Sequence, residues 1–306
     1  MIYTVTLNPS VDLLINLEDL NCGIRNHMKS ENTVPGGKAL NVSRILSQLR
    51  IPTVATGYTG GYQGEFIKDW LKRNGIMTDF VEISKQTRTN INMVLKDSET
   101  RIEADGPEIS EKEVNELIYY LSRVGEGDTV IMGGSIPPLK EKDIYGRMIS
   151  VCKANKANFV IDIPPEYLID AIKQGPLLVK PNDTDLEVMF GKKMSTTKDL
   201  IKYGLKTIDL GAKNTIVSLG ENGSLLFTSD KNVYRAFSMK GDIKNTIACR
   251  DAMIGGFVGT YMRTSDSLES YRVSVAAASA TAFVDDLPTS DEIEELIPKV
   301  NIEKLQ

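Results

Sequence analysis

The chain has 306 residues, with 36 lysines and arginines against 41 aspartates and glutamates, so its formal net charge is −5. This mild acidity, without basic blocks, argues against nucleic-acid or anionic-membrane partners. Three scattered cysteines exclude a disulfide framework, and a single histidine excludes a Cys/His zinc site. No apolar run approaches the length of a membrane span, and the first residues do not resemble a cleavable leader, so we expect a cytoplasmic protein.

The first third of the chain predicts short strands and two amphipathic helices. Residues 2–7 are apolar and β-branched and end at Asn8-Pro9, which is typical of a buried strand. Apolar residues recur with helical spacing from 40 to 49 and again around 66–71. We expect strands at 2–7, 13–16, 27–34 and 79–83, helices at 40–49 and around 66–71, and a hairpin over 90–104.

From about residue 114 onward, helices and strands alternate. This alternation implies right-handed crossovers and an α/β fold with a doubly wound, mostly parallel sheet flanked by helices. No repeat or linker divides the chain, so we expect one domain over 1–306, with a small β-lid built from about 12–34 and 86–105. The expected strands are 129–132, 158–162, 177–180, 214–218 and two within 223–236; the expected helices are one around 114–121, then 140–154, 166–173, 183–190, 196–208, 252–263 and 267–283, with a solvated helix over 291–305.

Glycines precede the helix at 40–49 in the run Gly36-Gly37-Lys38-Ala39-Leu40-Asn41. Backbone N–H groups at a helix N-terminus favour anions, and Lys38 adds a full charge. The run matches neither a P-loop nor a dinucleotide fingerprint, so a dinucleotide dehydrogenase is not expected. Taken alone, it is also compatible with a glycine turn that carries a surface lysine.

Two further polar clusters stand at the ends of predicted elements. Asn8 and Asp12 follow the first strand, and ligands of parallel sheets bind at the carboxyl ends of strands. Asp251 opens the helix at 252–263, after the run 245–250. An Asx turn explains the first cluster equally well, and a helix cap explains the second, because aspartate favours the first turn.

Together these segments resemble the PfkB/ribokinase superfamily of carbohydrate kinases, in the branch of 1-phosphofructokinase and tagatose-6-phosphate kinase. The resemblance runs from residue 1 to about 298 and covers several motifs in the same order. Thr87-Arg88-x-Asn90 and the Ser-Ala-Thr-Ala-Phe run are closer to 1-phosphofructokinase. The motifs include the opening residues 1–12, Gly60–Ile67, Thr87–Asn90, Gly106–Ile109, Gly134–Pro138, Lys180–Asn182, Val217–Gly220 and Ser279–Phe283.

The resemblance implies a ribokinase-like fold with a β-lid and ATP- and Mg²⁺-dependent phosphorylation of a sugar phosphate, most simply fructose 1-phosphate. It implies that Asp251 is the general base, a role suited to phosphoryl transfer by positioning and charge stabilisation. A homodimer through the lid is a further expectation. The other implied roles are sugar or phosphate binding for Asn8, Asp12, Gly36, Gly37, Lys38, Asn41, Arg88 and Asn90; nucleotide binding for Asn182, Ser218, Gly220, Gly223, Ala248 and Cys249; and magnesium, through water, for Asp185.

Several residues depart from the family pattern near the expected site. Ala248-Cys249-Arg250 stands where the family has Gly-Ala-Gly or Gly-Ser-Gly as a backbone anion hole. Arg250 either distorts this loop, which we favour, or supplies charge to the transferred phosphate as an arginine in cis. The alternatives are therefore a 1-phosphofructokinase, a tagatose-6-phosphate kinase, or a weakly active sugar-phosphate or nucleotide-binding protein. The other departures are His27, Ala39, Asp185 and Ala278.

Overall fold

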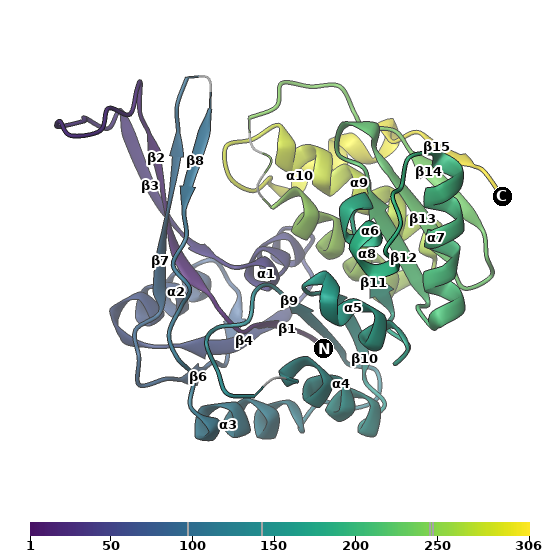
Figure 1. Ribbon diagram of the computed structural model, residues 1–306, viewed down its shortest axis with the longest axis horizontal. Helices are drawn as coiled ribbons and strands as arrows, with labels where there is room; N and C mark the ends of the chain where they lie inside the picture. The colour runs from purple at the N-terminus through teal and green to yellow at the C-terminus, as the bar shows by residue number, and fades with distance from the viewer. Residues whose placement is uncertain (97, 142, 245, 247) are drawn as a thin grey trace.

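The computed structural model describes all residues except 97, 142, 245 and 247. Its strands form a large central sheet and a four-stranded sheet that projects from it (Figure 1). The order in the central sheet is β15-β14-β13-β12-β11-β10-β9-β1-β4-β5, and β6 also pairs with β4. Its strands are β1 (Ile2–Thr6), β4 (Thr53–Thr59), β5 (Met77–Thr78), β6 (Val81–Glu82), β9 (Thr129–Gly133), β10 (Asn158–Asp162), β11 (Leu178–Val179), β12 (Asn214–Ser218), β13 (Ser224–Thr228), β14 (Val233–Ala236) and β15 (Ile302–Lys304).

The chain reverses its direction across the sheet at β1. It runs outward from β1 to β4 and β5, then returns to β9 on the other side of β1 and continues to β12. These neighbours pair in parallel, whereas β13, β14 and β15 add an antiparallel edge. The predicted doubly wound, mostly parallel sheet is confirmed. Ligands bind such sheets beside the reversal point, which here lies directly after β1.

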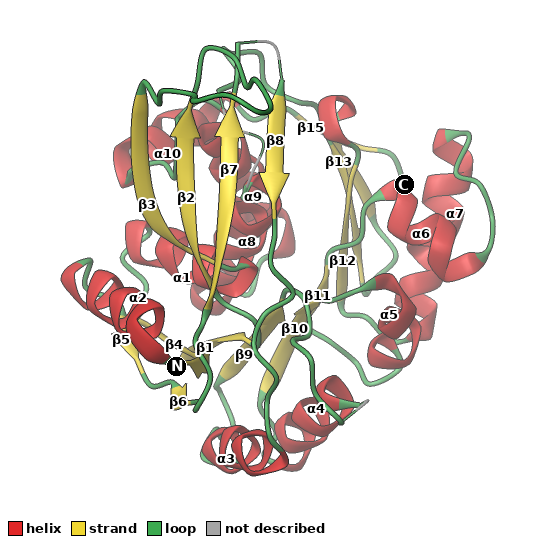
Figure 2. Cartoon of the chain, turned by 60° about the vertical axis from the view of Figure 1, so that its left-hand side comes forward, coloured by secondary structure: helices red, strands yellow, loops and turns green. Residues whose placement is uncertain are grey.

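Helices cover both faces of the central sheet (Figure 2). Alternate strand residues point to opposite faces, so Ile131 packs with α1, α8, α9 and α10, whereas Val130 and Met132 pack with α3 to α7. The third cluster joins α2 to Ala55 and Leu40. The helices are α1 (Lys38–Gln48), α2 (Gly61–Arg73), α3 (Glu111–Leu121), α4 (Ile144–Ala154), α5 (Pro165–Ile172), α6 (Asp183–Phe190), α7 (Thr197–Leu210), α8 (Cys249–Thr264), α9 (Ser267–Ala282) and α10 (Ser290–Leu296).

The second sheet, which we call the lid sheet, has the order β3-β2-β7-β8. β2 pairs antiparallel with β3 and parallel with β7, which places Asp12 opposite Asn90. In Figure 1 these strands extend away from the central sheet, at the purple and blue end of the chain. The lid sheet draws on the two segments predicted for it. Its strands are β2 (Ser10–Asn16), β3 (Ser30–Gly36), β7 (Arg88–Val94) and β8 (Glu99–Ile102).

Three parts of the fold differ from the sequence-based expectation. β4 was not predicted, because its threonines and Gly57 interrupt any apolar run, although most of the strand is buried. The expected strand at 79–83 is two short strands, β5 and β6. The expected solvated helix at 291–305 is wrong beyond α10, since β15 pairs with β14 there. Residues 97, 142, 245 and 247 of the predicted hairpin, helix and motif lie outside the described residues.

Candidate active site

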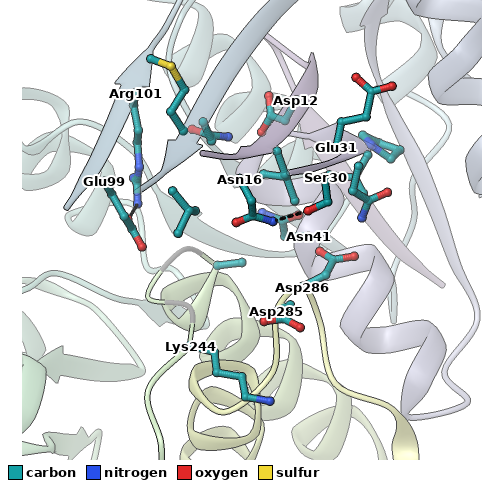
Figure 3. A pocket seen from close by; sticks show the side chains of 18 of the residues that line it. Asp12, Asn16, Ser30, Glu31, Asn41, Glu99, Arg101, Lys244, Asp285 and Asp286 are labelled. Atoms are coloured by element: carbon teal, nitrogen blue, oxygen red, sulfur yellow. Dashed lines mark hydrogen bonds and ion pairs between the residues drawn. The ribbon is translucent and has the colours of Figure 1, made fainter. Parts of the chain in front are cut away.

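A cavity of about 340 Å³ separates the lid sheet from the helices below it (Figure 3). Its inner end includes Asp12 of β2, Asn41 of α1 and Ala248, which precedes α8. Farther out, polar side chains of the lid sheet face the loop before α8 and the connection from α9 to α10. These are Asn16, Ser30, Glu31, Glu99 and Arg101 on the lid side, and Lys244, Asp285 and Asp286 opposite them.

Asp251 lies in the first turn of α8, where Asn41 connects it to the cavity. Asn41 Nδ2 donates a hydrogen bond to Asp251 Oδ2 at 2.9 Å, and Asp251 is only 5% exposed. Burial, followed by the nearby negative charge of Asp162, raises the pKa of the Asp251 carboxyl to about 7. A carboxylate with such a pKa can accept a proton near neutral pH, which a general base requires.

Beside Asp251 lies a group of charged residues that we call the ion cluster: Lys38, Asp162, Lys180, Asp185 and Arg250. Asp162 ends β10 and is almost fully buried. Lys38 Nζ lies 3.2 Å from Asp162 Oδ2, and Arg250 Nη2 lies 3.3 Å from Asp162 Oδ1. Burial raises the pKa of the Asp162 carboxyl, but the positive charges of Lys180, Lys38 and Arg250 outweigh it and lower the pKa. Asp162 is therefore held ionised.

Ala248, Cys249 and Arg250, which depart from the family pattern, lie at the start of α8. Ala248 is the N-cap residue and adopts the left-handed conformation, with φ 62°. Arg250 is already helical, and the left-handed residue of this loop is Ala248. The side chain of Arg250 points inward to Asp162 and Asp185. Burial raises the pKa of the Cys249 thiol to about 11, so it stays protonated.

Asp12 is fixed by residues of the lid sheet. Ser10 Oγ donates to Asp12 Oδ1 at 2.6 Å, and Asn90 Nδ2 donates to the same oxygen at 2.9 Å. A Cβ at Gly36 would stand 2.2 Å from the Asp12 carboxylate, so glycine is required there for Asp12 to occupy this position. Burial raises the pKa of Asp12. Asp12, Asn90 and Gly36 thus form one unit at the base of the lid sheet.

Arg88 and Asn8 lie at the junction of the lid sheet and the body. Arg88 donates to the carbonyl oxygens of Ala104 at 2.6 Å and Asn8 at 3.1 Å. The side chain of Asn8 donates to the carbonyl of Asp105 at 2.9 Å. Among the described residues, neither Arg88 nor Asn8 lines the cavity, and neither do Gly37, Lys38 and Asn90. Their substrate contacts stay predictions.

The residues expected at the nucleotide gather at the ends of two neighbouring strands. Asn182 caps α6 and forms a β-bridge with Ser218, the last residue of β12. Gly220 and Gly223 form the turn that follows Ser218. Asp185 is joined to this group because its Oδ2 accepts from the backbone of Asn182 at 2.9 Å and from Arg250 at 3.1 Å. Arg250, which pairs with both Asp185 and Asp162, joins this group to the end of β10.

Comparison with known proteins identifies the relationship. The pfkB family carbohydrate kinases match residues 5–293. The chain belongs to this family. A 1-phosphofructokinase of Bacillus subtilis is 37% identical over 305 residues, covering the whole of both chains, and a D-tagatose-1-phosphate kinase of Bacillus licheniformis is 32% identical over 306 residues, again with complete coverage. A putative phosphofructokinase from Staphylococcus aureus has a TM-score of 0.89 at 34% identity, covering 100% of this chain and 99% of the other.

Membership fixes the fold and the class of reaction. Phosphofructokinase-2 from Escherichia coli, solved with substrates and products, aligns with a TM-score of 0.92 at 25% identity, over 97% of this chain and 98% of the other. The fold is ribokinase-like, as predicted. This pfkB-family chain is a phosphotransferase with a hydroxyl acceptor, and sugar kinases of the family use ATP.

Sequence reasoning assigned no role to Asp162, Lys180 or Arg44 of this pfkB kinase. Asp162 could have been found, because it ends a predicted parallel strand, where ligands bind. Lys180 is 1% exposed, and its Nζ has no hydrogen-bond partner among the described residues. Arg44 joins α1 to the cavity wall through an ion pair with Asp286 and stacks over Trp70. Lys180 and Arg44 can be recognised as part of the site only from their tertiary contacts.

Among the described residues, no group of three or more histidine, cysteine, aspartate or glutamate side chains is placed to hold a metal ion. No helix in the described part of the chain is both long and apolar enough to cross a bilayer.

Proposed function

We propose that this chain transfers a phosphoryl group from ATP to fructose 1-phosphate, giving fructose 1,6-bisphosphate and ADP. The observation that carries the proposal is Asp251, buried and bonded to Asn41 at the inner end of the cavity. Relatives named 1-phosphofructokinase, at 37% and 36% identity over the full chain, support this substrate. The second candidate is D-tagatose 1-phosphate, because relatives named for it are 32% and 27% identical.

In this mechanism, Asp251 accepts the proton of the sugar hydroxyl that attacks the terminal phosphorus of ATP. A new oxygen–phosphorus bond forms as the bond to ADP breaks, and ADP leaves with the electron pair of that bond. Asp12 and Asn41 would bind other sugar hydroxyls, because their side-chain oxygens and amide face the cavity. Lys38 and Arg88 would bind the phosphate already on the sugar, with Asn8, Gly36, Gly37 and Asn90 shaping that part of the site.

The nucleotide would lie along the path from Asn182 to Gly223. Ser218, Gly220 and Gly223 would contact its nucleoside part, and the N-terminus of α8, with Ala248 and Cys249, would face its phosphates. The carboxylates near this path that could serve Mg²⁺ are Asp162 and Asp185, and both accept a hydrogen bond from Arg250. These two carboxylates therefore do not fit a resident Mg²⁺, because both already accept hydrogen bonds from Arg250. We expect Mg²⁺ to arrive on the phosphates of ATP, with Asp185 as its predicted water-mediated contact.

We propose that residues 1–306 act as one domain and that two copies associate through the lid sheet. Ile102 on β8 is an exposed apolar residue that does not line the cavity, which supports such a contact on the outer face of this sheet. A related phosphofructokinase-2 structure is described as tetrameric. Because the proposed reaction consumes ATP, we propose that the protein is located in the cytoplasm. Light scattering on the purified protein, with Ile102→Lys as the variant, tests the dimer.

An ADP-release assay with Mg-ATP tests the reaction against a panel of sugar phosphates: fructose 1-phosphate, tagatose 1-phosphate, tagatose 6-phosphate and fructose 6-phosphate. We expect the highest kcat/KM with fructose 1-phosphate. A higher value for a tagatose phosphate would move the assignment to that sugar. Binding of a sugar phosphate without ADP release would contradict the proposal and favour the binding-protein alternative.

A further inference from the structure

One atom of Arg250 occupies a position that a metal ion could take. Its Nη2 lies 3.3 Å from Asp162 Oδ1, 3.1 Å from Asp185 Oδ2 and 3.5 Å from the carbonyl oxygen of Lys180. Two carboxylates and a backbone carbonyl are the ligands that hard divalent cations prefer. The three oxygens come from the end of β10, the residue after β11 and the first turn of α6, which are fixed by the central sheet.

Two buried charged residues, Asp162 and Lys180, lie next to this point. Asp162 is 3% exposed, and its second oxygen faces Lys38 at 3.2 Å. The Lys180 ammonium is also buried, at 1% exposed, and has no hydrogen-bond partner among the described residues. Its charge lies close enough to Asp162 to influence the pKa of that carboxyl. Because an unpaired buried charge is costly, an ammonium without a hydrogen-bond partner depends on the neighbouring carboxylates for its stability.

We propose that Arg250 serves as the resident cation of this site, and that its guanidinium prevents a divalent ion from binding between Asp162 and Asp185. An arginine is always charged, so both carboxylates keep a positively charged partner whether or not nucleotide is bound. When Arg250 is removed, the carboxylates of the cluster and Asp251 face only the two lysines. A divalent cation then has both the oxygen ligands and the charge imbalance that it needs.

Binding of Mn²⁺ to the full-length protein, without nucleotide or sugar, tests the proposal. The loss of the free Mn²⁺ signal in electron paramagnetic resonance measures it directly. We expect no stoichiometric site in the wild type. Arg250→Ala should gain one site, with a dissociation constant of about 0.1–1 mM, the range of weak oxygen-ligand sites. The double variant Arg250→Ala with Asp185→Asn should lose it again, and Arg250→Lys should remain without a site.

Arg147→Ala is the matched control. Its side chain is 34% exposed, against 36% for Arg250, and it pairs with Glu141 at 3.1 Å. The charge change is the same, but the ligand oxygens of the ion cluster are untouched, so no Mn²⁺ site should appear. An equal gain in Arg147→Ala would show that only net charge matters, and would overturn the proposal.

Folding is checked by circular dichroism and thermal unfolding. Arg250→Ala should have a lower Tm than the wild type in EDTA, and Mn²⁺ should raise it, because a ligand that binds only the folded state stabilises it. If the alanine variant does not fold, Arg250→Gln keeps hydrogen-bond donors without the charge and should also gain the site. An Asp185-dependent site of equal affinity in the wild type, or no gained site in folded Arg250 variants, would contradict the proposal. Since no substrate is present, these outcomes are independent of the proposed reaction.

Discussion

The ion cluster with Asp251 and the outer part of the cavity are both polar, but they differ in what fixes their charges. Asp251 and Asp162 are 5% and 3% exposed, and each is held by partners from different elements. The outer cavity instead presents exposed side chains such as Glu31 and Arg101. Charges fixed in a buried site stabilise a transition state without reorganisation, whereas exposed pairs contribute little. The chemistry should therefore depend on the cluster, and selection of the sugar on the lid sheet.

The largest expected effect is the loss of Asp251. Asp251→Asn removes the proton acceptor but keeps a side chain of the same size, so kcat should fall by about 10²–10⁴. The affinity for ATP should change little. ADP release and nucleotide binding measure the two quantities. Asp286→Asn on the outer cavity wall is the matched control and should cost less than ten-fold. If Asp251→Asn keeps most of the activity, the base lies elsewhere.

The pKa of Asp251 predicts the pH dependence of the reaction. A base is active only when deprotonated, and burial raises this pKa to about 7. The value of kcat/KM should therefore rise with pH through about 7 and level off above it, and it should fall about 50-fold between pH 7 and pH 5. The titration of the sugar phosphate itself, near pH 6, must be subtracted. A flat corrected profile over this range would contradict the assignment of Asp251.

Arg88 lies at the base of the lid sheet and is expected to bind the phosphate of the sugar. Arg88→Ala should raise KM for the sugar phosphate about ten-fold or more, because a charge-assisted hydrogen bond is worth about 1.5–3 kcal/mol, while KM for ATP changes little. Arg101→Ala, in the outer cavity, is the comparison. A larger effect from Arg101 would place the sugar's phosphate in the outer cavity. Equal effects of Arg88→Ala on both substrates would indicate a structural role through the carbonyls of Asn8 and Ala104.

The sequence predicts the helices of this fold better than some of its strands. Helical spacing located α1 and α7, because each buries one apolar face. β4 was not predicted, because its burial depends on its place between β1 and β5 rather than on its composition. β15 was not predicted either, because two of its three residues are charged. Ile302, Glu303 and Lys304 pair with β14 at the edge of the sheet.

Part of the candidate site could also be predicted from the sequence, and part could not. Asp251, Asn41 and Asp12 were found from motifs; Asn41 and Asp12 line the cavity, and Asp251 is bonded to Asn41. The environment of Arg250 could not be predicted, because Asp162 and Asp185 are 88 and 65 residues away in the sequence. A motif specifies which residue types are present, but ion pairs between distant elements depend on how the elements pack.

The smallest expected effect tests the loop where the cavity meets the ion cluster. Ala248 adopts a left-handed conformation that costs a non-glycine residue about 1–2 kcal/mol. Ala248→Gly removes this cost but adds about 0.4–1 kcal/mol of chain entropy to the unfolded state. The free energy of unfolding should therefore rise by about 0.5–1 kcal/mol in urea denaturation. Ala252→Gly, which is fully buried and helical in the same α8, should lower it instead. If both variants are destabilised, Ala248 is not left-handed in solution, and the N-terminus of α8 presents its N–H groups to the nucleotide in a different way.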